Sequence, residues 1–217
     1  MNQPLVTCLC LTMAGRESRL SGAIDCFCRQ TYPNRELLIV GDSWDVIESI
    51  AEGPISYLKA SAFVRPAGQC NIGQKRNLGC ESAAGDLIAI WDDDDFSAPD
   101  RLDFQVKSFE INQKSVTGFQ LMKFTDGANW WQFCLGPGQV FGSSLCFTRE
   151  WWKANPFPEI NVGEDAGFCE RAASTNQLAL CPDVDLMYSN IHPGNTSKKK
   201  VHEPGWMALP GFQWPGR

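Results

Sequence analysis

The chain lacks an excess of positive charge and any long apolar run. Its 19 Lys and Arg against 25 Asp and Glu give a net charge of −6. Nucleic acid is therefore not an expected partner, because phosphate backbones are bound mainly by clustered Lys and Arg. The one basic run, residues 198–200, is expected to be a solvated tail. No apolar run approaches the roughly 20 residues needed to cross a bilayer, so no membrane span is expected.

Several short catalytic motifs are also missing. There is no GxxxxGK[ST] phosphate loop, no GxGxxG after the first apolar segment and no GxSxG nucleophile turn. Histidine is scarce, with only His192 and His202, so a histidine-based triad has few candidates. These absences argue against P-loop nucleotide hydrolysis, dinucleotide binding and serine hydrolase chemistry.

Ten cysteines are present, but their spacing does not indicate a disulfide framework or a zinc site. None forms a CxxC pair, and several lie inside apolar segments, for example Cys8, Cys10 and Cys80. The chain begins without a basic region ahead of its first apolar stretch, which is not typical of a signal peptide. Reduced, mostly buried thiols in a cytoplasmic protein are expected.

Hydrophobic periodicity predicts alternating strands and helices in the first half. Strands are expected at 5–11, 36–40 and 87–91, an extended segment at 55–64, and helices at 16–30, 44–51, 71–84 and 98–110. This order predicts an α/β fold, with a mostly parallel central sheet and helices on both faces. Short strands are expected within 115–148, the first of them over 116–124, and within 178–191, forming a small antiparallel extension, with one more helix at 164–173. The last residues are expected to be a strap across the domain or a mobile end.

The most informative segment is DLIAIWDDDD at residues 86–95, where a short apolar strand leads into four consecutive carboxylates. Adjacent negative charges repel one another, and a divalent cation such as Mg²⁺ or Mn²⁺ would relieve this, since these hard ions prefer oxygen ligands. Side chains alternate along a strand, so Asp92 and Asp94 are expected to share one side. The alternative is a solvated acidic turn that begins the next helix. Thr12 and Asp42 also follow predicted strands, and ligands of parallel sheets bind at that edge.

The sequence resembles the family-2 glycosyltransferases of GT-A fold over roughly residues 4–195. The resemblance rests on the first 40 residues including QTYPNRELLIV, on IGQKRNLGCESAAGDLIAIWDDDDFSAPDRL with its DxD carboxylates, and on VGEDAGFCERA. It implies one GT-A domain over residues 1–197, with a nucleotide-binding half at 1–110, an acceptor and catalytic half at 111–197, and a tail at 198–217. It also implies an inverting glycosyltransferase of hexosyltransferase type.

The resemblance further implies a site. The nucleotide-binding residues would be Thr12, Glu17, Asp42, Lys75, Arg76, Asn77, Asp92 and Asp93. Glu17 is included because residues 13–16 differ from the Asn-Arg-Pro of many relatives. A Mn²⁺ or Mg²⁺ ion would be held by Asp94, Asp92 and His192, with Asp95 supporting the loop. Asp165 would be the general base, with Glu164 as the second candidate. The donor would be a nucleotide-diphosphate sugar, with a UDP-sugar favoured.

Simpler explanations exist for several of these residues. Acidic residues such as Glu164 and Asp165 favour the first turn of a helix through its dipole. Lys75 and Arg76 could lie on a solvated helix face, and His192 could be a loop residue. Four tryptophans either form an acceptor platform or belong to the core: Trp130, Trp131, Trp151 and Trp152.

The acceptor is expected to be a carbohydrate, lipid-linked or protein hydroxyl, recognised with help from the tail, a homo-oligomer or a partner. Two other functions stay open: a sugar-nucleotide nucleotidyltransferase, and a noncatalytic metal-dependent carbohydrate-binding module.

Overall fold

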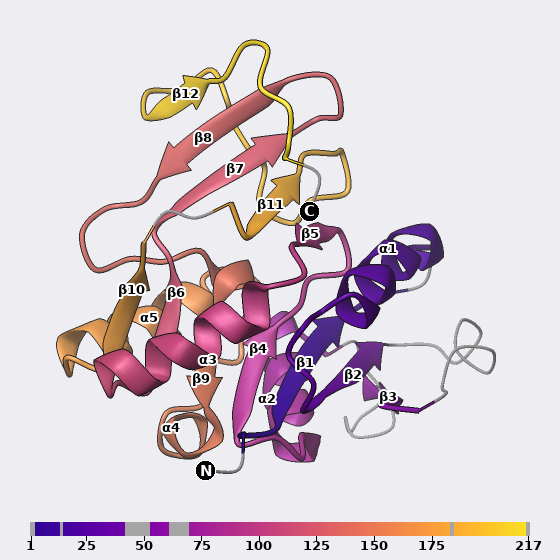
Figure 1. The fold of residues 1–217 in the computed structure, drawn as a ribbon, viewed down its shortest axis with the longest axis vertical. Helices are drawn as coiled ribbons and strands as arrows, with labels where there is room; N and C mark the ends of the chain where they lie inside the picture. The colour runs from indigo at the N-terminus through magenta and orange to yellow at the C-terminus, as the bar shows by residue number, and fades with distance from the viewer. Residues whose placement is uncertain (1–2, 14, 42–52, 61–69, 183–184, 216–217) are drawn as a thin grey trace.

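The structure is a computed structural model that describes residues 3–13, 15–41, 53–60, 70–182 and 185–215. Asp42 and the helix predicted at 44–51 lie outside these residues, and so does the side chain of Glu17. Figure 1 shows the chain arranged around two sheets, a larger one that contains β1 and a smaller one that contains β7. The main sheet forms the body of the fold, and the second sheet lies against one end of it (Figure 1).

The main sheet has seven strands and is mostly parallel. Its spatial order is β10 (Leu178–Cys181), β6 (Val116–Phe119), β9 (Cys146–Thr148), β4 (Leu87–Ile90), β1 (Val6–Leu11), β2 (Arg35–Gly41) and β3 (Ile55–Lys59). Among the described strands of this sheet, only the two pairings of β9, with β4 and with β6, are antiparallel. The predicted α/β fold with a mostly parallel central sheet is therefore confirmed.

Helices cover both faces of this sheet. They are α1 (Glu17–Cys28) and α3 (Arg101–Asn112) on one face, and α2 (Ile72–Ser82) and α5 (Glu164–Ser174) on the other. The central strand β1 serves both cores, because alternate side chains point to opposite faces. Leu9 packs in the core beneath α2 and α5, while Cys8 and Cys10 pack in the core beneath α1 and α3. Burial on both faces explains why this strand reads as a continuous apolar run.

The second sheet has five strands. Their order is β12 (Trp206–Ala208), β8 (Trp130–Cys134), β7 (Leu121–Thr125), β11 (Met187–Asn190) and β5 (Asp95–Ser97). Within the part of the chain that the structure describes, only β7 and β11 pair in parallel here, and the other neighbours are antiparallel. The apolar segment expected to be one strand is divided at Gln120, so that β6 joins the main sheet and β7 joins the second. The tail is a strap, because β12 pairs with β8.

One helix boundary was predicted wrongly, and one short helix was missed. The helix predicted from residue 98 begins at Arg101, because Ser97 ends strand β5 and accepts a 2.9 Å hydrogen bond from Nη1 of Arg101. A short helix, α4 (Arg149–Ala154), was not predicted. Thr148 caps it by accepting a 3.2 Å hydrogen bond from the backbone N–H of Trp151.

The cysteines form no disulfide in the described part of the chain, and most are buried. Among the same residues, no helix has the length and apolar character needed to cross a bilayer.

Candidate active site

A cleft of about 840 Å³ lies between the carboxyl edge of the main sheet and one face of the second sheet. The end of β1 contributes Thr12, and the turn after β4 contributes the acidic run. The second sheet contributes Phe124 and Phe133, and the start of α5 contributes Asp165. The cleft thus brings together sequence segments that are far apart in the chain, at the edge where parallel sheets bind ligands.

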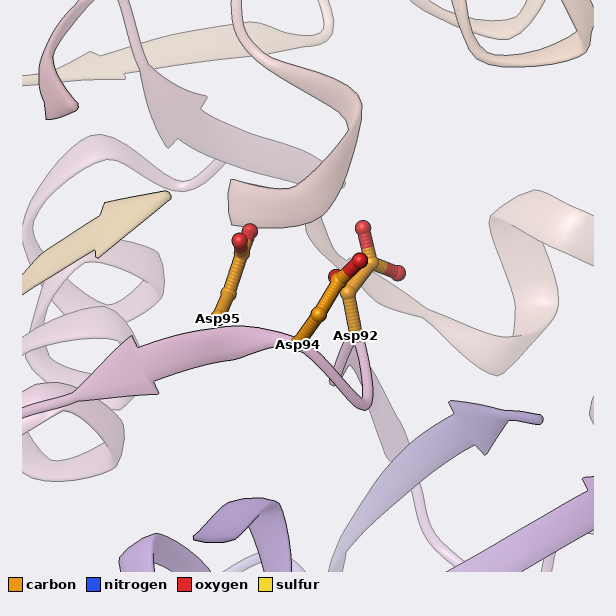
Figure 2. A group of neighbouring side chains, drawn as sticks. All are labelled: Asp92, Asp94 and Asp95. Atoms are coloured by element: carbon orange, nitrogen blue, oxygen red, sulfur yellow. The ribbon is translucent and has the colours of Figure 1, made fainter. Parts of the chain in front are cut away.

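Three carboxylates form the centre of the cleft. Asp92, Asp94 and Asp95 can each offer one oxygen, with all three oxygens within 4.8 Å of one another. Figure 2 shows the three side chains projecting to the same side of the chain where β5 begins. Asp92 and Asp94 share a side as expected, but a turn at 93–94 separates β4 from β5 and brings Asp95 in beside them. Strand alternation alone could not predict that Asp95 joins this group, because the turn at 93–94 interrupts the alternation of side chains.

The surroundings of Asp92 and Asp95 favour the protonated form of both carboxyl groups. Burial is the main cause that raises the pKa of Asp92, and the neighbouring carboxylates add to it while Arg76 opposes it. Burial also raises the pKa of Asp95 well above its usual range, with Asp92 and Asp94 adding to the shift. Hydrogen bonds from hydroxyl groups, including a 2.8 Å bond donated by Ser189, only partly offset this.

The donor set fits a hard divalent cation. Three carboxylates that converge from one turn are ligands of the kind that Mg²⁺ and Mn²⁺ take. His192 lies at the edge of the group, with Nε2 at 2.9 Å from Oδ2 of Asp94, so the cluster has an imidazole within reach.

Asp93 points away from this group and contacts the end of β1. Its Oδ2 accepts a 2.8 Å hydrogen bond from Oγ1 of Thr12, and its Oδ1 lies 3.1 Å from Nη2 of Arg16. Burial raises the pKa of Asp93 to about 6, while Arg16 and Thr12 act in the opposite direction. Thr12 and Asp93, both predicted site residues, therefore form one contact between adjacent strands. Arg16 was not predicted as a site residue.

Asp94 is held by several polar groups. Arg16 pairs with its carboxylate, and Arg19 lies 4.0 Å away while also contacting the ring of His192. The side chain of Asn190 donates a 2.6 Å hydrogen bond to the backbone oxygen of Asp94. This network fixes the loop after β11 against the acidic turn.

The start of α5 supplies the acidic pair. Gly163, with φ of +87°, turns the chain into the helix. Glu164 is buried and pairs with Arg76, Nη2 to Oε1 at 3.2 Å. Burial raises the pKa of Glu164, and Arg76 opposes the rise. Asp165 is only half-buried and lines the cleft. The pair thus has two environments, one carboxylate engaged by an arginine and the other beside the cleft.

The segment Gly142–Ser144 fixes the place of Asp165. A Cβ atom added to Gly142 would lie 2.0 Å from Oδ2 of Asp165 and 2.7 Å from its Cβ. Only a glycine at this position leaves room for the carboxylate. The backbone N–H of Ala166 donates a 2.8 Å hydrogen bond to Oδ1 and orients the group further.

The first turn of α2 carries the basic residues. Asn71 caps this helix by accepting a 2.8 Å hydrogen bond from the backbone N–H of Gln74. Lys75 and Arg76 line the cleft. Nε and Nη1 of Arg76 are buried and have no hydrogen-bond partner among the described residues. Arg76 also lies over the ring of Phe157, and its positive charge at the lining of the cleft suits an anionic ligand.

Asn77, on the same helix, has structural contacts. Its Oδ1 accepts hydrogen bonds from Nε1 of Trp152 at 3.0 Å and from the backbone N–H of Phe157 at 2.9 Å. These contacts join α2 to α4 and to the segment between α4 and α5. The nucleotide contact expected of Asn77 stays a prediction, as do those of Asp42 and Glu17.

The sequence did not identify the aromatic and basic lining of the second sheet. None of the four tryptophans considered as a platform is among the described residues that line the cleft. Phe124, Phe133, Phe141 and Trp206 line it instead. The lysines at 198–200, expected to be a solvated tail, line it too. Composition gave no signal for these residues, because the tail reaches the cleft only through the pairing of β12 with β8.

Comparison with known proteins agrees with this geometry. The family model of glycosyl transferase family 2 matches residues 8–167. The chain belongs to glycosyltransferase family 2. An uncharacterized glycosyltransferase of Haemophilus influenzae is 32% identical over 222 residues, which cover 95% of this chain and 87% of the relative. Another, from Methanocaldococcus jannaschii, is 30% identical over 128 residues, or 58% of this chain and 44% of that protein.

Solved structures with the same fold include TarS of S. aureus. The TarS 1–349 structure in complex with UDP-GlcNAc matches with a TM-score of 0.69 and 16% identity, covering 88% of this chain and 60% of that one. A second TarS structure, in complex with UDP, matches with a TM-score of 0.65 and 18% identity over 87% of this chain and 61% of that one. The GT-A fold predicted for this family-2 glycosyltransferase is therefore confirmed.

Proposed function

We propose that this family-2 glycosyltransferase moves a sugar from a UDP-sugar to an acceptor hydroxyl with inversion of the anomeric centre. The observation that carries the proposal is that Asp165 lines the same cleft as the carboxylates Asp92, Asp94 and Asp95. A base and a charged donor site on one cleft are what direct displacement at the anomeric carbon requires. The bound UDP-GlcNAc and UDP of the TarS structures support the choice of donor.

The donor nucleotide is proposed to lie along the edge of the main sheet. Thr12 and Asp93 are in contact with each other there, and Asp42, which follows β2, is the further residue proposed for base or ribose. Lys75 and Arg76 on α2 are proposed to meet the diphosphate, because both line the cleft and Arg76 has N–H groups without a partner among the described residues.

Asp92, Asp94 and Asp95 are proposed to hold Mn²⁺ or Mg²⁺, with His192 as a further candidate ligand through its nitrogen near Asp94. Such an ion supplies positive charge to the donor diphosphate when it is bound. The protein's own part is to hold three half-buried carboxylates together at one turn.

Asp165 is proposed as the general base. It accepts the proton of the acceptor hydroxyl while the acceptor oxygen bonds to the anomeric carbon and the bond from that carbon to the diphosphate breaks. Lys75 and Arg76 offset the negative charge that the diphosphate gains. Glu164 remains the second candidate for the base, but its ion pair with Arg76 favours a role in holding that arginine in place.

A cytoplasmic location is proposed from the buried thiols, none of which is in a disulfide within the described residues. The acceptor is proposed to be a carbohydrate or a glycan carried by a lipid or a protein.

Calorimetric titration with UDP, GDP and CDP, each with and without Mn²⁺, tests the proposal. UDP is expected to bind best and to bind more weakly without the ion. Asp95→Asn is expected to reduce the metal effect, while Asp25→Asn, an exposed change on α1, is the matched control. Binding of no nucleoside diphosphate by the wild type would contradict the proposed function.

A further inference from the structure

The basic run at residues 198–200 lies at the cleft. Lys198, Lys199 and Lys200 all line it, together with Asn195 and Trp206 from the same strap. A chain with net charge −6 thus places three consecutive cations at the cleft that holds the acidic cluster. A basic run that served only solubility would have no need to line a concave site.

These lysines have little negative charge of the protein's own to balance them. Within the described residues, no carboxylate lies within ion-pair distance of Lys198 or Lys199. Lys198 donates to the backbone oxygen of Pro193, and Nζ of Lys199 lies 5.7 Å from the ring centroid of Phe124. Lys200 pairs with Glu203 at 3.0 Å, but both side chains are largely exposed, and such pairs contribute little.

The register of the second sheet gives the position of the lysine strip, residues 198–200. Phe124 on β7 pairs with Ser189 on β11, and Ser189 pairs with Asp95 on β5. Neighbouring strands are about 4.8 Å apart, so Phe124 lies about 10 Å across the sheet from Asp95. Lys199, over Phe124, is therefore displaced from the acidic cluster toward the β8 and β12 side of the cleft.

The floor beside the lysines is aromatic. Phe133 and Trp206 are half-buried, line the cleft and pack together with ring centroids 4.9 Å apart. Aromatic faces of this kind present an apolar surface suited to the C–H face of a sugar ring, while neighbouring ammonium groups attract negative charge.

We infer that the residues 198–200 strip and the Phe133–Trp206 floor form the acceptor subsite, and that the acceptor is a carbohydrate bearing a phosphate or carboxylate group. The inference rests on the proposed function. It assigns the strip to the acceptor rather than the donor because the donor phosphates have other cationic candidates in the cleft, Lys75 and Arg76 on α2.

A glycan array with matched neutral, 6-phosphorylated and uronate forms of each glycan tests the inference, with the protein saturated with UDP and Mn²⁺. The wild type is expected to bind one anionic form about tenfold more tightly than the neutral form of the same glycan. This factor is the effect of one charge-assisted hydrogen bond. The phosphate and uronate arms identify which anion is preferred. The variant Lys198→Gln/Lys199→Gln/Lys200→Gln is expected to lose the preference. Lys107→Gln/Lys153→Gln, which changes two exposed lysines outside the cleft, is expected to keep it.

Titration of the same variants with UDP separates the possible failures. Equal UDP affinity in all three proteins, with the anion preference lost only in the triple variant, supports the inference. A large loss of UDP affinity in the triple variant would assign the lysines to the donor and overturn it. Absence of any anion preference in the wild type would overturn it as well. Failure of the wild type to bind UDP would instead count against the proposed function.

Discussion

Replacing Gly142 by alanine would place a methyl group where the carboxylate of Asp165 lies. The added Cβ would be 2.0 Å from Oδ2 and 2.7 Å from both Cβ and Cγ of Asp165, whereas ordinary contacts begin at 3.4 Å. Gly142 is not among the described residues with positive φ, so alanine suits its backbone. The substitution therefore acts on Asp165 through space rather than through backbone strain.

The size of the displacement sets the expected effect. The carboxylate oxygen and the new methyl group must separate by about 1.4 Å, the difference between the two distances above. Because the Cβ and Cγ of Asp165 are also too close, rotation of the carboxylate alone does not relieve the overlap. A misplacement of about 1 Å at a reacting group costs about 10²-fold in rate. We expect kcat to fall by about that factor, with a loss of about 1–3 kcal/mol in the free energy of unfolding from overpacking.

The assay is sugar transfer, or donor hydrolysis in the absence of an acceptor, measured together with UDP affinity and the melting temperature. UDP affinity is expected to change little, because the acidic turn and α2 are untouched. Gly22→Ala is the control, since nothing lies within 4 Å of the added methyl group and alanine favours the helix interior. A Gly142→Ala enzyme that kept the wild-type kcat would refute the placement of Asp165 as the base.

Three further predictions follow from the contacts. Arg76→Lys keeps a positive charge near Glu164 but loses the unpartnered N–H groups of the arginine, so UDP affinity measured by calorimetry should fall about tenfold. Unchanged UDP affinity would show that Arg76 is not part of the donor site. Arg101→Met should lower the free energy of unfolding, measured with urea, by about 2–5 kcal/mol, because the buried guanidinium of Arg101 donates hydrogen bonds to side-chain and backbone oxygens of three neighbouring segments. A loss below about 1 kcal/mol would show that water replaces these hydrogen bonds. A thiol reagent at neutral pH should modify the exposed Cys28 and Cys134 quickly and the buried cysteines slowly, because burial raises the pKa of six of the buried thiols. Rapid modification of any cysteine besides Cys28 and Cys134 would contradict the packing.

The main sheet could be predicted because its central strands are short apolar runs that can be recognised in the sequence. Apart from Thr7 and Glu36, residues 5–11, 36–40 and 87–91 are apolar, and parallel strands buried on both faces require such runs. The acidic run after the third of these segments was informative for the same reason, since a strand that ends in carboxylates places them at the ligand-binding edge.

The second sheet carried weaker signals. The strand expected over residues 116–124 passes from one sheet to the other at Gln120, and no local pattern marks that change. Asp95 joined the carboxylate group because a turn ends the strand alternation, and the lysines reached the cleft because β12 pairs with β8. Both facts depend on contacts between distant segments, which periodicity does not record.

The most direct test of the central claim is the rate of sugar transfer from a UDP-sugar by Asp165→Asn, measured beside UDP affinity. Asparagine has the shape of aspartate but cannot accept the proton, so kcat is expected to fall by about 10²–10⁴-fold while UDP affinity stays close to that of the wild type. An Asp165→Asn enzyme that transferred sugar at the wild-type rate would contradict the account, because the base would then lie elsewhere.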